Sequence, residues 1–486
     1  MTWKFKDLRE YITFLESKGD LRRITTRVST ELEITEITDR MVKSGGPALL
    51  FEHVEGHTMP LLINAFGTYQ RAAWALGVEN LGDLTVRVRE LLGMVKEPHK
   101  GLLSKLKALG QLAHIASFEP KTVKNAPCQE VVITGDDVDL STLPVLTCWP
   151  DDAGPFITLP LVVSRDPVTG VRNIGIYRMQ VYDRNTTGMH WQTHKVGAHH
   201  QRLAQEQKLE RLEVAVALGA DPATMWAGSA PLPPDLDEYV LAGFIREEGV
   251  ELVKCVTVDL EVPAHAEIVL EGYVDPNESR PEGPFGDHTG YYSPAEEYPV
   301  FHVTAMTRRT EPIYPTTMVG RPPTEDHFMG KVSERLFLPA IQMMLPEVVD
   351  INMPAEGAFH NLVIVSIKKE YRGQAHKVVH GLWGMGLLAL SKTIIVVDGD
   401  VNLQNPSEVA WRVTNNLDPQ YDIFFASGPI DDLDHASVSA GVGSKVGIDA
   451  TAKGALEGRE RDWPPDIVMS KKVKALVDRK WEQYGI

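Results

Sequence analysis

Two carboxylates and a histidine lie close together in a segment that is rich in glycine and proline. The segment reads RPEGPFGDHTGYY, from Arg280 to Tyr292, and contains Glu282, Asp287 and His288. Three glycines and two prolines in so short a stretch favour a loop of fixed shape. Active sites use carboxylates on rigid loops to separate the pKa values of an acid and a base. The pattern predicts an acid–base site, with a structural turn as the alternative.

A second group of polar residues lies upstream, in the segment RNIGIYR from Arg172 to Arg178. In a flat strand, Asn173 and Arg178 would face opposite sides because they are five residues apart. A bulge or twist at Gly175 would bring both side chains toward one pocket. A barrel strand whose polar residues face solvent is the plainer alternative on spacing alone.

Histidine is concentrated in the segment MHWQTHKVGAHH. Four of the 16 histidines fall there, namely His190, His194, His199 and His200. Neutral imidazole is the commonest metal ligand, so a metal site is one interpretation. An exposed polar loop is the alternative, and it is favoured for His199 and His200.

Glu238 follows Asp235 closely at a predicted helix start. These two residues fit a capping box, in which the glutamate reaches back to the helix N-terminus. A carboxylate near a helix start can equally face a cation. Spacing leaves both interpretations open.

Several common catalytic motifs are absent from the sequence. It has no G-x-x-x-x-G-K-[ST] phosphate loop, no G-x-S-x-G nucleophile elbow and no H-E-x-x-H zinc helix. The nearest dinucleotide signal runs from Gly441 to Gly447, but its third glycine is one residue late and no clear strand precedes it. We therefore expect a plain glycine loop there. Lys445 lies within it and could contact a phosphate.

The elements that position these residues belong to a chain of 486 residues, which is too long for one ordinary core. Residues 1–120 alternate helix and strand signals and predict an N-terminal α/β domain with a linking helix in the stretch 96–124. Residues 121–320 carry short strands in series, which predicts a split β-barrel. Residues 321–486 alternate helices with apolar strands, the pattern of a doubly wound parallel sheet.

The N-terminal segment predicts an amphipathic helix rather than a signal peptide. Leu8, Tyr11, Ile12 and Leu15 fall at i, i+3, i+4 and i+7, and Gly19 supplies the stop. No apolar run approaches the roughly 18 residues that a membrane span needs. The three cysteines form no disulfide framework or metal-binding pair, so we expect a cytoplasmic protein.

The net charge of the chain indicates which kinds of partner it can bind. With 49 basic against 66 acidic residues, the net charge is -17. This excess argues against a nucleic-acid surface, which needs clustered lysine and arginine. An anionic small molecule is still compatible, because a local basic pocket can exist on an acidic protein.

The segments described above resemble the UbiD family of reversible decarboxylases, and the resemblance extends along essentially the whole chain. The branch that is most similar contains the 4-hydroxy-3-polyprenylbenzoate decarboxylases of quinone biosynthesis. The matching segments, in chain order, are PCQEVVITGDDVDL, TCWP, RNIGIYRMQ, VALGADPAT, EGPFGDHTGYY, GRPPTED and GSKVGIDAT.

The resemblance implies a cofactor and its ligands. Family members use prenylated FMN, which a separate flavin prenyltransferase makes, together with Mn2+ or another divalent ion and often K+ or Na+. The implied metal ligands are Asn173, His190 and Glu238, although His190 would alternatively only line the flavin. The residues implied to line the flavin, within the central split-barrel domain, are Ile176, Tyr177, Arg178, His190, Trp191, Gln192, Lys195 and Val196.

The resemblance also implies the catalytic residues. The family's acid–base network of arginine, glutamate and a second acid corresponds to Arg178, Glu282 and Asp287. The ferulic acid decarboxylase branch has glutamate at the last position, so Asp287 favours a phenolic quinone precursor over a cinnamic acid. Asp287 is the expected general acid, and Arg178 is expected to keep Glu282 ionised.

Three functions are compatible with these residues and this resemblance. The first is decarboxylation of an aromatic or α,β-unsaturated acid, either a 4-hydroxy-3-polyprenylbenzoate or a smaller aryl or heteroaryl acid. The second is a flavin reductase that uses NAD(P)H, and the third is a non-catalytic scaffold. The resemblance further implies a homo-oligomer, either a dimer or a hexamer, with residues 321–486 as the oligomerisation domain. A polyprenylated substrate would add peripheral membrane contact.

Overall fold

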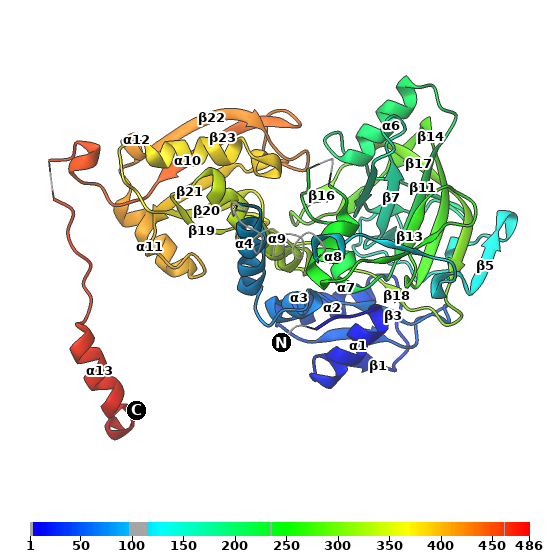
Figure 1. Cartoon of the computed structure of the whole chain (residues 1–486), viewed down its shortest axis with the longest axis horizontal. Helices are drawn as coiled ribbons and strands as arrows, with labels where there is room; N and C mark the ends of the chain where they lie inside the picture. Colours follow the sequence, from blue (N-terminus) through cyan, green and yellow to red (C-terminus); the bar gives the residue numbers. More distant parts are fainter. Residues whose placement is uncertain (1–2, 97–113, 234–235, 461) are drawn as a thin grey trace, which may run out of the picture.

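The computed structural model describes residues 3–96, 114–233, 236–460 and 462–486. Figure 1 shows these parts coloured along the sequence. Helices and sheets alternate through the described chain, so the mixed α/β class predicted from the sequence is confirmed. Most of the linking helix predicted in the stretch 96–124 lies outside the described residues.

A four-stranded sheet and its helices form the N-terminal part. The strand order is β1-β2-β3-β18, so the last position is filled by β18 (Tyr314–Pro315) from the end of the central part. The predicted amphipathic helix is confirmed as α1, whose apolar face is buried. The elements of this part are α1 (Leu8–Ser17), β1 (Leu21–Ile24), α2 (Glu33–Lys43), β2 (Ala48–Phe51), β3 (Leu61–Ile63), α3 (Tyr69–Ala75) and α4 (Leu81–Lys96).

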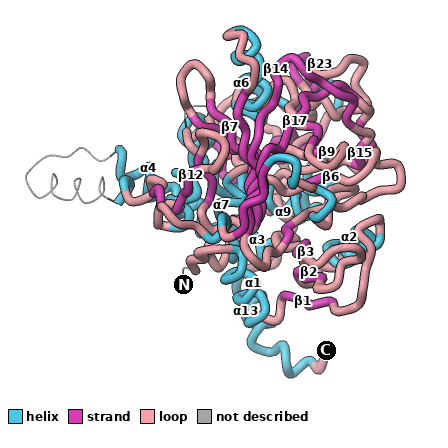
Figure 2. Tube along the Cα trace, turned by 90° about the vertical axis from the view of Figure 1, so that its right-hand side faces the viewer, coloured by secondary structure: helices cyan, strands magenta, loops and turns pink. Residues whose placement is uncertain are grey.

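An antiparallel sheet forms the middle part of the chain, and its long strands are visible in Figure 2. The strand order is β10-β17-β14-β11-β7-β8, and β5 pairs with β17 as a seventh strand. Its strands are β5 (Val131–Thr134), β7 (Leu161–Arg165), β8 (Arg172–Gly175), β10 (Thr186–Gly188), β11 (Leu212–Leu218), β14 (Ile268–Glu282) and β17 (Glu296–Arg308).

The order of these strands does not confirm the split β-barrel. The path ends at β10 on one side and at β8 on the other, and the described strands close no barrel. Alternation along a strand predicts which face is buried, but it does not predict which strand lies beside it. The remaining central elements are β4 (Lys121–Val123), β6 (Phe156–Ile157), β9 (Met179–Gln180), α6 (Val196–Glu206), α7 (Pro222–Ala227), α8 (Glu238–Arg246), β12 (Glu251–Lys254), β13 (Glu261–Pro263), β15 (Phe285–Gly286) and β16 (Tyr292–Ser293).

The C-terminal part contains a five-stranded sheet of order β19-β20-β21-β23-β22. The inner strands β20, β21 and β23 are parallel, whereas both edge strands are antiparallel, so the sheet is mixed rather than wholly parallel. Helices cover both faces: Val363 and Val365 pack with α10, and Ile364 packs with α11 (Figure 1). The elements are α9 (Glu325–Met344), β19 (Val348–Asn352), β20 (Leu362–Ile367), α10 (Gln374–Trp383), β21 (Thr393–Asp398), α11 (Pro406–Asn416), α12 (Pro419–Asp422), β22 (Ile423–Pro429), β23 (Val442–Asp449) and α13 (Lys471–Lys480).

The long helix α9 joins the three parts. At its start, the buried Glu325 carboxylate accepts the backbone N–H groups of Asn64 and Phe66 at 3.0 and 2.9 Å. Along its length it packs beside α4, where the Thr85 hydroxyl donates to the Arg335 carbonyl at 2.6 Å. The helix therefore carries the C-terminal sheet at a fixed place relative to the N-terminal part.

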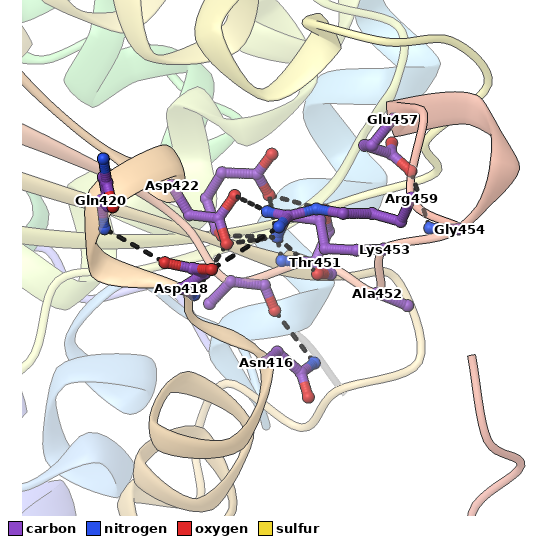
Figure 3. Close-up of polar contacts among 12 residues, drawn as sticks. Asn416, Asp418, Gln420, Asp422, Thr451, Ala452, Lys453, Gly454, Glu457 and Arg459 are labelled. Carbon is purple, nitrogen blue, oxygen red and sulfur yellow. Dashed lines mark hydrogen bonds and ion pairs between the residues drawn. The ribbon is translucent and has the colours of Figure 1, made fainter. Parts of the chain in front are cut away.

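A polar cluster anchors the chain after the last strand of the C-terminal sheet (Figure 3). The Lys453 ammonium donates to the carbonyls of Asp449 and Thr451 at 2.7 and 2.8 Å. Arg459 donates to the Asp422 carboxylate at 3.2 Å. Beyond this cluster the chain projects away from the body and ends with α13, which has no buried residue (Figure 1). No described helix has the length and apolar character that crossing a membrane requires.

Candidate active site

The predicted acid–base loop is a short hairpin of β15 and β16 that follows directly on β14. Glu282 is the last residue of β14, and Asp287 follows β15. The Asp287 N–H donates to the Tyr291 carbonyl at 3.0 Å, and the Gly290 N–H donates to the Asp287 carbonyl at 2.9 Å. The hairpin thus fixes the position of Asp287 relative to Glu282.

Gly286 allows this hairpin to lie against Trp149. A Cβ at position 286 would lie 2.2 Å from Cδ1 of the Trp149 ring. The indole is itself held in place, because its N–H donates to the Val319 carbonyl at 2.8 Å. The Gly286 N–H also donates to Asp152 at 2.7 Å. A side chain at this position would therefore displace the segment that carries Asp287.

Arg178 contacts the carboxylates of the hairpin from a segment that lies 104 residues before Glu282 in the chain. The strand β8 ends at Gly175, against which the Tyr177 ring packs so closely that a Cβ would lie 2.4 Å from it. The chain therefore leaves the strand at this point, and the bulge expected at Gly175 is instead the end of the strand. This break, rather than alternation, decides where Arg178 points.

The Arg178 guanidinium binds both carboxylates of the hairpin. Its Nε lies 2.9 Å from Oε1 of Glu282, another nitrogen forms an ion pair with Asp287, and a third bond of 3.0 Å reaches the Ser293 hydroxyl. The guanidinium also lies over the Phe285 ring, 4.5 Å from its centre. The side chains of Glu282 and Asp287 are 0 and 9% exposed, so this is a buried ion-pair network.

The network fixes the charge of each member. Burial raises the pKa of Glu282, but the hydrogen bond from His190 and the Arg178 charge outweigh it and lower the pKa. Burial also raises the pKa of Asp287, yet His288 and Arg178 hold it well below its usual range. Burial lowers the pKa of His288, but its bond to Asp287 raises it above the ordinary value. The network therefore favours two ionised carboxylates and a protonated His288.

His190 has one nitrogen bound and one nitrogen unpartnered. Its Nδ1 lies 2.5 Å from Oε2 of Glu282. Burial lowers the pKa of His190 despite Glu282, so the ring is neutral and donates from Nδ1. The lone pair then lies on Nε2, which is buried and has no hydrogen-bond partner among the described residues. Carboxylate–histidine pairs of this kind orient metal-binding imidazoles.

Glu238 is the first residue of α8, and the capping-box interpretation is wrong. The N-cap is Asp237, whose carboxylate accepts the Tyr239 N–H at 2.8 Å. Asp235, the other half of the expected box, lies outside the described residues. Burial raises the pKa of Glu238 to about 7, although the Ile174 N–H and the Arg172 charge act against it.

Asn173 lies beside Glu238. The Ile174 N–H, one residue along from Asn173, donates to Oε2 of Glu238 at 3.0 Å. The Asn173 amide group donates to the Tyr177 hydroxyl at 3.4 Å, which leaves its carbonyl oxygen as an acceptor. The polar side-chain contact of His190 runs to Glu282 instead, and no polar contact between described residues joins His190 to Asn173 or Glu238.

The residues expected to line a flavin lie in two neighbouring stretches. The Ile176 N–H donates to the Gly228 carbonyl at 3.1 Å, and the Tyr177 ring meets Trp191 edge-on with centres 6.4 Å apart. Trp191 packs on Gly197, where a Cβ would lie 2.4 Å from the indole nitrogen. That nitrogen is buried and unpartnered among the described residues. The two stretches therefore meet through their aromatic side chains.

Gln192, Lys195 and Val196 lie at the start of α6. Lys195 is the N-cap, its N–H donates to the Gln192 carbonyl at 2.9 Å, and Val196 is the first helical residue. Burial lowers the pKa of Lys195. No carboxylate lies within ion-pair distance of its ammonium in the described part of the chain. A helix N-terminus next to an unpaired ammonium suits a phosphate group.

The other histidines of this segment have different roles. His199 is exposed, as expected, but His200 is buried, and its Nδ1 lies 2.9 Å from the Ser164 hydroxyl. His194 lies 3.6 Å from Asp432 of the C-terminal part. The segment is therefore not one polar loop, because α6 begins within it, places His200 on its buried face and leaves His199 exposed.

The expected glycine loop at Gly441–Gly447 is also wrong. These residues begin β23, which pairs along its length with β22. Lys445 is buried and donates to the carbonyls of Ala389 and Ser391 at 2.5 and 2.9 Å. Since it satisfies backbone carbonyls, Lys445 is a structural residue.

His360 is a site residue that sequence reasoning missed. It belongs to the C-terminal part, and its Nε2 lies 2.8 Å from Nε2 of His288. The two residues are 72 positions apart, and no local pattern marks His360. Only the packing of the C-terminal part against the hairpin brings His360 to His288, which in turn binds Asp287.

Three domains of one family match this chain. Residues 12–90, 121–322 and 327–450 match the N-terminal, Rift-related and C-terminal domains described as 3-octaprenyl-4-hydroxybenzoate carboxy-lyase, of the UbiD group. An uncharacterized protein of Archaeoglobus fulgidus is 51% identical over 480 residues, which are 99% of this chain and 98% of that protein.

Two solved enzymes share the whole fold. The UbiD-class enzyme HmfF of Pelotomaculum thermopropionicum, in complex with FMN, is 31% identical with a TM-score of 0.80 over 97% of this chain and 99% of its own. An evolved dimeric form of HmfF holds prFMN, with 31% identity and a TM-score of 0.76 over 95 and 97%. The closed form of vanillic acid decarboxylase of Sedimentibacter hydroxybenzoicus is 28% identical, with a TM-score of 0.87 over 99% of both chains. Its open form has a TM-score of 0.81 at 27% identity over the same shares.

Proposed function

Because this chain belongs to the UbiD family of decarboxylases, we propose that it releases CO2 from an aromatic or α,β-unsaturated carboxylic acid, with Asp287 as proton donor. The observation that supports the proposal is the buried contact of Arg178 with both Glu282 and Asp287. This is the arginine–glutamate–acid arrangement that the resemblance implied. A structural turn would not need two buried carboxylates on one guanidinium.

We propose that the substrate is a 4-hydroxybenzoate with a substituent at position 3. The matching family description names 3-octaprenyl-4-hydroxybenzoate, and the similar vanillic acid decarboxylase acts on a smaller member of the same chemical class. The larger, polyprenylated acid is the first candidate, because the family description covers all three parts of the chain. The TM-score of 0.87 to the vanillic acid enzyme favours the smaller aryl acid as the second candidate.

Prenylated FMN, when bound, supplies an electron sink for the electron pair that remains after CO2 has left. The residues proposed to hold it fit such a group. The buried Trp191 nitrogen has no partner among the described residues, and the Lys195 ammonium at the N-cap of α6 has no carboxylate within ion-pair distance there, although the Asp431 charge acts on it. The similar enzyme HmfF binds FMN, and an evolved dimeric form of HmfF binds prFMN.

The donor types proposed for the metal suit Mn2+ or another divalent ion, accompanied by K+ or Na+, although the described residues hold no group of three or more His, Cys, Asp or Glu side chains placed to bind a metal. Glu238 is buried with a raised pKa, the Asn173 carbonyl oxygen is available, and the His190 Nε2 has no partner. Carboxylate, carbonyl and imidazole donors suit manganese or magnesium, whereas thiolates would indicate zinc. We propose that these three residues hold the cation that neutralises the flavin phosphate.

The chain's own residues have defined tasks in this proposal. Arg178 keeps Glu282 and Asp287 ionised and close together before the substrate binds. Glu282 also fixes the neutral tautomer of His190. The hairpin, packed on Trp149, limits the access of water to Asp287, so that a carbanion-like carbon would meet this acid rather than solvent.

We also propose that the enzyme is a homo-oligomer, a dimer or a hexamer. The C-terminal segment supports this, because α13 has no buried residue, its Val473 and Leu476 are exposed, and Trp481 directly after it is exposed as well. A helix of ten residues without tertiary contacts is marginal in water. Packing on a second copy would stabilise it.

The test is to co-express the protein with a flavin prenyltransferase and manganese, and then to measure the bound chromophore and CO2 release. The panel should contain 3-prenylated 4-hydroxybenzoates, vanillic acid and an α,β-unsaturated acid. We expect prenylated flavin and CO2 from at least one 4-hydroxybenzoate. Unmodified FMN with NAD(P)H oxidation and no CO2 would instead identify a flavin reductase.

A further inference from the structure

The proposed reaction consumes one proton for each CO2 released, because the carbon keeps its electron pair until it binds a proton. Asp287 is ionised and its side chain is only 9% exposed, so another group must supply that proton. We propose that His288 holds the proton that Asp287 delivers, and that His360 of the C-terminal part orients the His288 ring for this transfer. This inference rests on the proposed function.

The geometry assigns both nitrogens of His288. Its Nδ1 lies 2.7 Å from Oδ1 of Asp287, and its Nε2 lies 2.8 Å from Nε2 of His360. Two imidazole nitrogens at that distance need one hydrogen between them, so one ring donates and the other accepts. Asp287 raises the pKa of His288, whereas burial and then His288 lower the pKa of His360 to about 4. His288 is therefore the imidazolium and His360 the neutral acceptor.

The second nitrogen of His360 leaves the contact with His288 unopposed. If Nε2 accepts, the hydrogen of the neutral ring lies on Nδ1. That Nδ1 is buried and has no partner among the described residues. No competing acceptor therefore pulls the ring out of its contact with His288.

Charged groups on several elements surround the two rings. His288 faces the carboxylates of Asp287, Asp326 and Asp431, which all favour its protonated form. His360 faces Lys195 and His288, which favour its neutral form, and Asp431 and Asp287, which oppose it. The acidic groups thus concentrate the proton on the ring that contacts Asp287.

The proposed step moves one proton from His288 to Asp287. The N–H bond at Nδ1 of His288 breaks, its electron pair stays on the nitrogen, and an O–H bond forms on Asp287. Asp287 then gives this proton to the carbon that lost CO2 and returns to the carboxylate. His288 is left neutral and takes its next proton from solvent before the following cycle. No oxidant or reductant is required.

The first test uses His288→Asn in the enzyme loaded with flavin and manganese. Asparagine keeps an N–H toward Asp287 but cannot release a proton. We expect bound flavin and KM to stay unchanged, kcat to fall by about 10²-fold or more, and added imidazole to restore part of it. The matched control is His200→Asn, a buried histidine bound to Ser164, which should keep the kcat of the wild type.

The second test separates orientation from proton transfer at His360. His360→Gln keeps an acceptor for the His288 N–H, whereas His360→Ala removes it. We expect kcat to fall about tenfold in the alanine variant, the worth of one hydrogen bond to a charged group, and to be largely restored by glutamine. Equal kcat in the wild type and both variants would overturn the role of His360.

The third test needs no substrate and distinguishes failure of this proposal from failure of the proposed function. NMR of protein labelled with ¹⁵N-histidine, with His288→Asn for assignment, reports the protonation of His288 at about pH 7. We expect an imidazolium in the wild type and a neutral ring in Asp287→Asn. A neutral His288 in the wild type, or full kcat with an unchanged pH profile in His288→Asn, would overturn the proposal. Absence of CO2 release from any acid by the wild type would overturn the proposed function and, with it, the catalytic part of this inference.

Discussion

At the scale of single residues, one buried guanidinium decides the charge of the site. Arg178 contacts Glu282 and Asp287 at once, and His190 and His288 each bind one of these carboxylates. A buried carboxylate alone would take up a proton, whereas these partners keep both ionised. The two histidines therefore differ in charge. His190, which binds Glu282, is neutral, whereas His288, which binds Asp287, favours the protonated form.

The first prediction concerns Asp287→Asn. Asparagine nearly preserves shape, so the protein should fold and bind flavin, while CO2 release should fall by about 10²- to 10⁴-fold because the proton donor is lost. Flavin absorbance and CO2 release measure the two effects separately. The control is Asp137→Asn on an exposed turn of the same domain. Full activity of the Asp287 variant would show that another group delivers the proton.

The second prediction concerns the metal ligands. Glu238→Ala and Asn173→Ala should release both manganese and flavin, because the cation that joins the flavin phosphate to the protein would lose a ligand. Metal analysis and flavin absorbance after gel filtration measure the loss. Glu248→Ala, at an exposed position just beyond the same helix, should retain both. If the Glu238 variant retains both as well, Glu238 serves only to bind the Ile174 N–H.

At the scale of elements, two short structures position these side chains. The break after β8 turns Arg178 into the site, and the hairpin of β15 and β16 presents Asp287 to it. Both depend on glycines whose neighbours are aromatic rings, Tyr177 at Gly175 and Trp149 at Gly286. The shape of the site therefore depends on positions that carry no functional group.

The third prediction tests the hairpin through Gly286→Ala. The added Cβ would lie 2.2 Å from the Trp149 ring, so the hairpin or the ring must move. We expect a loss of about 1–3 kcal/mol in the free energy of unfolding and a larger loss of kcat than of cofactor binding. Denaturant unfolding and CO2 release measure these. Gly82→Ala in α4, where a Cβ meets no atom within 4 Å, is the control: it should leave kcat unchanged and should not lower the free energy of unfolding, because alanine favours a helix over glycine. An unchanged kcat at Gly286→Ala would mean that the hairpin adjusts without moving Asp287.

At the scale of the whole molecule, the site lies where the central and C-terminal parts meet. His288 contacts His360, the Tyr291 and His435 rings have centres 4.1 Å apart, and His194 lies near Asp432. The structure is also more similar to the closed than to the open form of vanillic acid decarboxylase, with TM-scores of 0.87 and 0.81. The C-terminal part therefore belongs to the candidate active site as well as to the proposed oligomer.

The fourth prediction concerns the C-terminal segment. Removal of residues 470–486 should leave each subunit folded, because no residue of α13 is buried, yet convert the oligomer to a smaller assembly. Light scattering after gel filtration measures the mass. Leu476→Glu should act in the same direction, whereas Val168→Glu on an exposed turn should not. An unchanged mass for the truncated chain would place the oligomer contact elsewhere.

The sequence by itself predicted the fixed loop with its two carboxylates and several elements, whereas the catalytic roles of Arg178, Glu282 and Asp287 stay predictions. Glycine and proline between Glu282 and Asp287 predicted a fixed loop, and the periodicity of Leu8 to Leu15 predicted α1, because both signals are local. The family also followed from the sequence, since its motifs recur in order along the chain. The domain boundaries and the metal and flavin ligands stay predictions.

Only the tertiary structure decided which distant groups share the site. Alternation placed Asn173 and Arg178 on opposite faces, but the strand ends at Gly175, and the spacing rule no longer applies beyond that residue. The open central sheet and the mixed C-terminal sheet depend on strand pairing, which alternation does not encode. His360 reaches His288 through packing between two parts of the chain, and such contacts leave no periodic trace in the sequence.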